Sequence, residues 1–192
     1  MVAGLRPQAR TVLARMRILV FGVLSSCKGP TLDVSRSSQS VSLTGKRVGV
    51  IAMKCSNSGF GNTVSDAMAN FLLASGCNVV ERTQIMSLAG QGDVQVMESN
   101  GFVDLVRIGQ LANVDYLVVG SVTLDNRLSV DFWTGGPESK VVVTGATARV
   151  VDAKNAQVVV AVTYEPGRGS GWHRPVVVGQ EIGRAILGIS EK

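Results

Sequence analysis

The sequence predicts an α/β domain with a mixed β-sheet, an N-terminal βαβ unit, a C-terminal antiparallel hairpin and helices packed on the sheet. The first indication is an apolar run, a helical pattern and a second apolar run within about 35 residues, which is the size of a parallel βαβ unit. The second is a pair of β-rich segments joined by a short polar turn over residues 152–156. The third is a composition of 45% hydrophobic and 17% charged residues, which can fill a core and excludes a disordered chain.

Each element is predicted by its own pattern. Apolar runs indicate buried strands, apolar residues three and four apart indicate helices, and strict alternation indicates a half-exposed strand. Asn62 or Thr63 can cap the first helix, Gly76 lies where that helix ends, and Asn155 can take a positive φ in the C-terminal turn. The expected elements are a strand over 47–53, a loop over 54–61, a helix over 64–72, a strand over 78–82, helices over 84–89 and 105–112, a strand over 116–122, a half-exposed strand over 128–132, strands over 141–151 and 157–163, and a helix over 178–186.

Residues 1–26 are predicted to be a lipoprotein signal peptide. Residues 1–17 hold four arginines and no acid, and residues 18–24 are uninterrupted apolar residues. This run is too short to cross a bilayer as a helix, which needs about 20 residues. The ending Leu24-Ser25-Ser26-Cys27 resembles the lipobox of bacterial lipoproteins, which implies that Cys27 is the lipid attachment site. Met1 and Met16 both stay open as the start of the chain.

Removing the predicted signal peptide changes the charge of the chain. The full sequence has a formal net charge of +5, but the remainder holds 15 basic and 14 acidic residues. No block of lysine or arginine is left to neutralise phosphates, so no nucleic-acid partner is expected.

A tether and one domain are expected after the signal peptide. Residues 27–45 are rich in serine, contain Pro30 and are predicted to be a flexible tether. Residues 46–190 are predicted to form the periplasmic α/β domain. Lys28 stands where an aspartate would signal retention in the inner membrane of enteric bacteria. By resemblance, the lipid anchor is therefore expected in the outer membrane, with the domain facing the periplasm.

No residue is nominated as catalytic, and neither a cofactor nor a metal is expected. The single histidine, His173, lies in a loop without the Gly-x-Ser-x-Gly pattern of a nucleophile, and the histidine and cysteine content does not suit a zinc site. Trp133 and Trp172 stand in predicted loops, where they either pack in the ordinary way or bind a protein partner. The alternative function is a periplasmic enzyme or small-ligand binder that uses the loop Gly169–His173.

Cys55 and Cys77 are predicted to be free thiols. They lie at opposite ends of the expected parallel unit, and a strand of six residues spans about 20 Å. A disulfide requires Cα atoms about 4.4–6.8 Å apart.

Three segments carry a resemblance to a known family. They are Val79-Val80-Glu81-Arg82, the run from Ile108 to Ser121 with Asp115-Tyr116 at its centre, and Ala148-Arg149-Val150-Val151-Asp152. Together they resemble the CsgG-like family, the family of the curli secretion channel, whose domain is also similar to that of the lipoprotein activator of penicillin-binding proteins. The likeness covers about residues 46–188. Asn113 stands where a glycine is usual, and Asn155-Ala156 replace the usual Thr-Gly turn.

The resemblance implies a protein-binding accessory in envelope assembly, either in curli-type secretion or in cell-wall synthase activation. Its partners would be secretion components or a peptidoglycan synthase, and the fold allows a homo-oligomer. In the curli channel that this family resemblance brings in, each subunit looks as if it adds two hairpins that cross the membrane. A strand that spans a membrane needs about 9–11 residues. Residues 121–146 have room for one short hairpin and residues 164–175 for none, so we expect that this chain is not a pore by itself.

Overall fold

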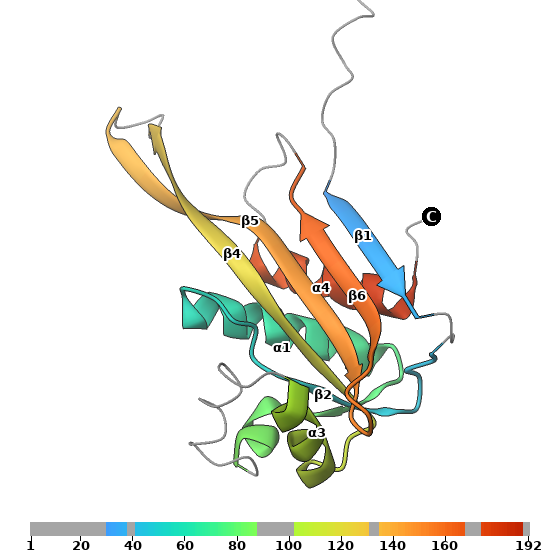
Figure 1. Ribbon diagram of the computed structural model, residues 1–192. Helices are drawn as coiled ribbons and strands as arrows, with labels where there is room; N and C mark the ends of the chain where they lie inside the picture. The colour runs from blue at the N-terminus through green and yellow to red at the C-terminus, as the bar shows by residue number, and fades with distance from the viewer. Residues whose placement is uncertain (1–29, 38–40, 88–101, 131–134, 168–173, 190–192) are drawn as a thin grey trace, which may run out of the picture.

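Six strands form one mixed sheet in the order β1-β6-β5-β4-β2-β3 (Figure 1). The computed structural model describes residues 30–37, 41–87, 102–130, 135–167 and 174–189. The strands are β1 (Thr31–Arg36), β2 (Arg47–Val50), β3 (Asn78–Val80), β4 (Tyr116–Val130), β5 (Pro137–Asp152) and β6 (Val158–Glu165). The helices are α1 (Ser58–Ala74), α3 (Phe102–Leu111) and α4 (Pro175–Leu187), together with a short helical segment over residues 82–87.

The strand pairing confirms the predicted fold class. Strand β2 is parallel to both β3 and β4, so β2, α1 and β3 form the expected βαβ unit. Strands β5 and β6 form the expected C-terminal antiparallel hairpin, and β4 and β1 pair antiparallel at its two sides.

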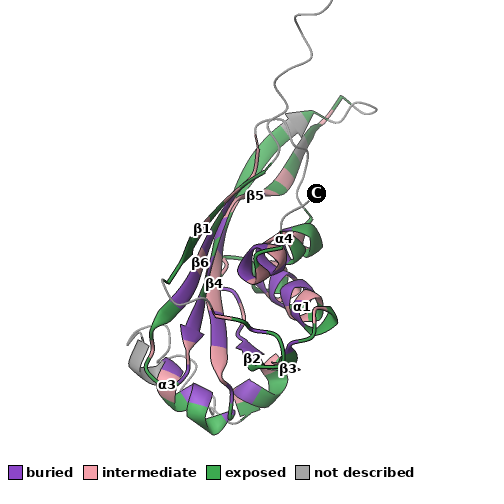
Figure 2. Cartoon of the chain, turned by 90° about the vertical axis from the view of Figure 1, so that its right-hand side faces the viewer, coloured by how far each residue is buried: buried purple, intermediate pink, exposed green. Residues whose placement is uncertain are grey.

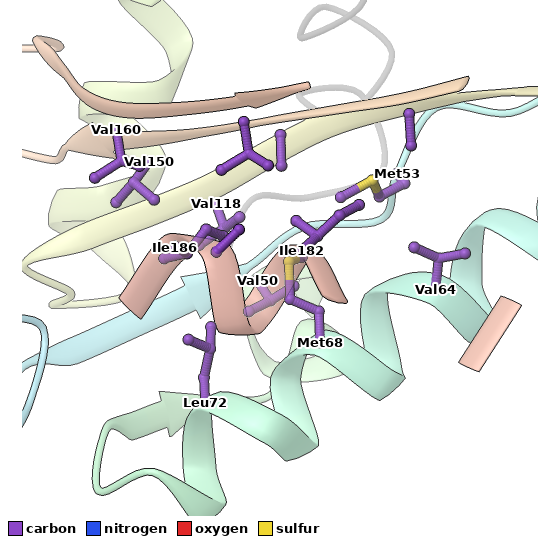
Figure 3. Close-up of a cluster of buried hydrophobic side chains, with 14 of the residues drawn as sticks. Val50, Met53, Val64, Met68, Leu72, Val118, Val150, Val160, Ile182 and Ile186 are labelled. Carbon is purple, nitrogen blue, oxygen red and sulfur yellow. The ribbon is translucent and has the colours of Figure 1, made fainter. Parts of the chain in front are cut away.

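Helices α1 and α4 cover one face of the sheet, which we call the inner face (Figure 2). Figure 3 shows Met68 and Leu72 of α1 and Ile182 of α4 packed beneath Val118 and Val150 of the sheet. These five side chains are fully buried, and each adds roughly 1.5–3 kcal/mol of hydrophobic stabilisation. This layer holds the main core.

Among the described residues, helices cover the opposite, outer face only at the end that holds β2, β3 and the start of β4 (Figure 2). There Leu105 and Ile108 of α3, together with Ile85, pack on Leu117 and Val151 of the sheet. The β2–β4 region is therefore buried from both sides, as is usual for parallel strands.

Helices α1 and α4 approach each other closely because two glycines on α4 face α1. A Cβ at Gly179 would collide with the carbonyl oxygen of Val64 and lie 2.8 Å from the Cβ of Ala67. One turn later, a Cβ at Gly183 would lie 3.0 Å from the ring of Phe71. The two helices thus form one tightly packed layer beneath the sheet.

Helix α1 begins earlier than the sequence pattern predicted. Its cap is Asn57, whose Oδ1 accepts a hydrogen bond from the backbone N–H of Phe60 at 3.1 Å, and not Asn62 or Thr63. The loop expected over residues 54–61 is therefore wrong for its last four residues. Gly61 lies in this first part of the helix. A glycine is required there because a Cβ would collide with the carbonyl oxygen of Met53.

The tether expected over residues 27–45 is also wrong in part, because residues 31–36 form the edge strand β1. All six residues pair with β6, and Leu32 and Val34 pack against the main core. The alternation of polar and apolar residues in this short segment supplies one face that the sheet can bury.

Two further details differ from the prediction. The strands expected over 116–122 and 128–132 are one continuous strand, β4, as far as the described residues extend. In the β5–β6 turn the positive φ belongs to Ala156 (58°), while the side chain of Asn155 accepts a hydrogen bond from the N–H of Gln157 at 3.0 Å. Among the described residues, no helix has the length and apolar character needed to span a membrane.

Candidate protein-binding site

The end of the β4–β5 pair extends beyond the rest of the sheet (Figure 1). We call residues 124–130 and 137–143 the projecting hairpin. These residues pair only with each other within the described ranges, because the β5–β6 ladder ends at Ala146 and Tyr164. A register shift between Thr123 and Leu124 marks the point where the hairpin leaves the sheet.

The projecting hairpin presents an apolar inner face. At its base Leu124 and Val143 still contact the main core. Because side chains alternate along a strand, Leu128, Val130 and Val141 continue on this same face, together with the polar Asn126 and Ser139. The three apolar side chains are 82%, 73% and 48% exposed. The core face of the sheet therefore continues into solvent, past the helices that cover it elsewhere.

The outer face of the same hairpin is charged. Asp125, Arg127 and Lys140 lie on it, and Arg127 is the direct cross-strand partner of Lys140. Asp125 and Arg127 are exposed. The hairpin is thus amphipathic across its thickness, with an apolar side and a charged side.

A shallow depression of about 270 Å³ lies on the outer face at the base of the hairpin. Hydroxyl groups dominate its lining, and Ser121 Oγ lies 3.1 Å from Thr147 Oγ1. Such groups can donate and accept hydrogen bonds but carry no nucleophile–base arrangement. Nowhere in the described part of the chain do three His, Cys, Asp or Glu side chains gather as metal ligands would.

Strand β1 is held to the helix layer by one arginine. The Nη2 of Arg36 donates hydrogen bonds to the carbonyl oxygens of Ala185 (2.7 Å) and Ile186 (3.0 Å) in the last turn of α4. The Ala185 carbonyl also accepts a hydrogen bond from the N–H of Gly188 at 3.1 Å, and a cation at this position complements the helix dipole. The other end of β1 begins at Thr31, which pairs with Glu165 at the end of the sheet from which the hairpin projects.

The site residues nominated from the sequence lie outside the described residues. This holds for Cys27, Trp133, Trp172 and the loop Gly169–His173. The apolar face of the hairpin was not nominated, although the alternation around Leu128 indicated a half-exposed strand. Alternation shows that a strand has an apolar side, but it does not show whether the same chain covers that side.

Cys55 and Cys77 are both free thiols in the structure, as the sequence predicted. Cys77 is buried, and burial raises the pKa of its thiol. Cys55 is half-buried. The parallel pairing of β2 and β3, on which the prediction rested, is also confirmed.

The segments that carried the family resemblance have structural roles in this domain. Asp115 Oδ2 accepts a hydrogen bond from the N–H of Arg47 at 3.0 Å, which joins the starts of β2 and β4. Asp152 Oδ1 accepts one from the N–H of Lys154 at 2.7 Å and shapes the β5–β6 turn. Asn113 has a φ of 50°, which explains why a glycine is usual there.

No protein-family model and no curated protein matches the sequence. Among solved structures, the chain is similar to PelC from Paraburkholderia phytofirmans, described as a dodecamer in two crystal forms. The dodecamer in space group C2, a single-residue variant of PelC, is 19% identical, with a TM-score of 0.55. The dodecamer in space group P6 is 20% identical, with a TM-score of 0.50. Both matches cover 85% of this chain and 99% of the PelC chain.

Two weaker structural likenesses accompany PelC. The C-terminal domain of LpoB from Salmonella enterica is 12% identical over 64% of this chain and 82% of its own, with a TM-score of 0.44. The lipoprotein GNA1162 from Neisseria meningitidis is 15% identical over 75% of this chain and 97% of its own, also with a TM-score of 0.44. The PelC comparisons show a shared fold, and membership of the CsgG-like family stays a prediction.

Proposed function

We propose that this protein is an outer-membrane lipoprotein, anchored through Cys27 and facing the periplasm, that acts as a protein-binding accessory in envelope assembly. The proposal covers curli-type secretion and cell-wall synthase activation, and it gives the domain no catalytic role. The observation that carries it is the position of β1, which begins only four residues after Cys27. The signal-peptide pattern of residues 1–26 supports it independently.

The short connection determines how the anchored domain would stand on the membrane. Four extended residues reach at most about 14 Å. The projecting hairpin starts from the same end of the sheet, and its seven residues per strand extend about 23 Å at roughly 3.3 Å per residue. A lipid on Cys27 would therefore hold the domain with this end toward the membrane. The hairpin, which is longer than the connection, would then lie inclined against the membrane surface, and the docked β1 would limit the rotation of the domain.

Self-association is part of the proposal. The fold is shared with PelC, which is described as a dodecamer. That likeness supports assembly of several copies of this chain on one membrane. Light scattering and native mass spectrometry of the purified protein in detergent test it, and a purely monomeric protein at all concentrations would contradict it.

Lipid labelling and fractionation test the anchor. Wild-type protein should incorporate labelled palmitate and collect with the outer membrane, whereas Cys27→Ala should do neither. Cys55→Ala is the matched control, because it removes a cysteine from the domain and leaves the anchor intact. An unlabelled wild-type protein would overturn the anchored part of the proposal.

In vivo crosslinking with capture on a C-terminal tag tests the accessory role. Capture of a peptidoglycan synthase with wild type, but not with Cys27→Ala, would support cell-wall synthase activation. Capture of secretion components would support the curli-type alternative. Loss of function in His173→Ala, without any captured protein, would favour the enzyme or small-ligand binder that uses the loop Gly169–His173.

A further inference from the structure

We propose that the apolar inner face of the projecting hairpin binds a second copy of this chain. The inference rests on the self-association in the proposed function and names the surface that produces it. The surface consists of Leu128, Val130 and Val141, with Leu124 and Val143 joining it to the core.

The first argument is that no described helix packs on the apolar face of the projecting hairpin. A two-stranded hairpin by itself is marginally stable in water, because it has no second layer to pack against. Here seven residues of each strand extend past the described helices, and Leu128 and Val130 are more than two-thirds exposed. Each step along this face holds at least one apolar residue beside Asn126 and Ser139, and an exposed apolar surface of this kind marks an interaction site.

The second argument is that the hairpin is apolar on one side only. A hairpin directed into a bilayer would place both faces in lipid, and at the level of Leu128 and Val141 the other face carries Arg127 and Lys140. A charged side chain facing lipid near the bilayer midplane is strongly unfavourable. A protein surface that packs on one face and leaves the other in water fits this pattern.

The third argument identifies that protein as a second copy. All copies anchored through Cys27 would stand in the same orientation, because the same short connection precedes β1 in each. Their hairpins would then lie at the same level at the membrane surface, which raises the effective concentration of one copy for the next. A different partner would have to be placed at this level by other means.

Other exposed apolar residues are available on the same molecule. Because Arg36, at the far end of β1, contacts the last turn of α4, the first turn of α4 lies toward the hairpin end. Val176 and Val177 in that first turn are 44% and 40% exposed. An apolar strip and a separate apolar patch on one chain can form a head-to-tail contact, which closes into a ring when the rotation allows it.

Site-specific photocrosslinking in cells tests the inference. A photoreactive amino acid replaces Leu128 in full-length, lipidated protein, and two copies with different C-terminal tags are co-expressed. The expected product is an adduct of twice the chain mass that carries both tags. The matched control places the same residue at Arg127, on the charged face, where this adduct should be at least about tenfold weaker.

A second variant keeps the test independent of the crosslinker. Leu128→Asp should weaken self-association at least about tenfold in light scattering, as removal of a central interface residue does, while Arg127→Gln leaves it unchanged. An adduct of Leu128 with lipid or only with another protein would overturn the inference. So would a wild-type multimer that survives Leu128→Asp, and in that case the proposed self-association still stands. A monomeric wild type would instead remove the self-association on which the inference rests.

Discussion

The two ends of strand β4 differ in what covers them. Near its start, the neighbouring residues Leu117 and Val118 point to opposite faces, and both are 0% exposed because helices cover both sides. Near its end, Leu128 is 82% exposed although it is the same residue type in the same strand. The comparison teaches that an apolar residue in a strand indicates a surface that has to be buried. In our proposal, the layer that buries it at this end of β4 belongs to another chain.

The sharpest test of this comparison is a matched pair of leucines. Leu117→Ala should lower the free energy of unfolding by about 3 kcal/mol, because it leaves a cavity between two packed layers. Leu128→Ala should change it by less than about 0.5 kcal/mol in the monomer, since little contact is lost. Urea unfolding measures both. Equal losses would show that the hairpin is covered by its own chain.

The close packing of α1 against α4 predicts the next largest effect on stability. Gly179→Ala should destabilise the domain by about 1–3 kcal/mol, because the added Cβ would collide with the carbonyl oxygen of Val64. Gly59→Ala is the control within a helix, since its Cβ would meet nothing closer than 3.4 Å. The control should be neutral or slightly more stable in thermal melting. A neutral Gly179→Ala would mean that the two helices can separate without loss.

A buried tyrosine at the base of the projecting hairpin should make the stability of the domain depend on pH. Burial, and then the nearby Glu181 carboxylate, raise the pKa of Tyr164 to about 12, from about 10 in an unfolded chain. The unfolded chain therefore releases this proton first as the pH rises. Stability should be unaffected by this group below pH 10 and should fall by up to about 1.4 kcal/mol per pH unit between pH 10 and 12. Tyr164→Phe should flatten the fall, and an unchanged slope would contradict the assignment.

The smallest expected effect concerns the strand that follows the lipid anchor. Arg36→Met should lower stability by about 1 kcal/mol and increase hydrogen exchange in the last turn of α4, because the hydrogen bonds from Arg36 to the Ala185 and Ile186 carbonyls are lost. Arg127→Met removes a charge of the same kind from the projecting hairpin and should leave both measurements unchanged. If exchange in α4 stays the same after Arg36→Met, the strand is not held by this contact.

Much of the fold follows from local patterns. The apolar run of β2, the helical spacing of α1 and the alternation around Leu128 in β4 each reflect how a backbone of fixed geometry presents its side chains. The errors lie where a tertiary contact overrides the local signal. Residues 58–61 read as a loop, yet they form the first turn of α1 beyond its cap Asn57, and a Cβ at Gly61 would collide with the carbonyl oxygen of Met53. Residues 31–36 read as a tether, yet the edge of β6 pairs with them.

The candidate site shows the same division. Sequence alone supplied the fold class, the free thiols, the prediction of a lipid anchor at Cys27 and the presence of an apolar side in the segment that contains Leu128. These follow from side-chain periodicity and from residue chemistry, which are local properties. Only the folded arrangement revealed that β4 and β5 run past their helices, that β1 starts at the same end, and that the apolar side there is left uncovered. Whether a strand face is buried depends on which distant segments pack on it. The periodicity of residues within the strand carries no information about those segments.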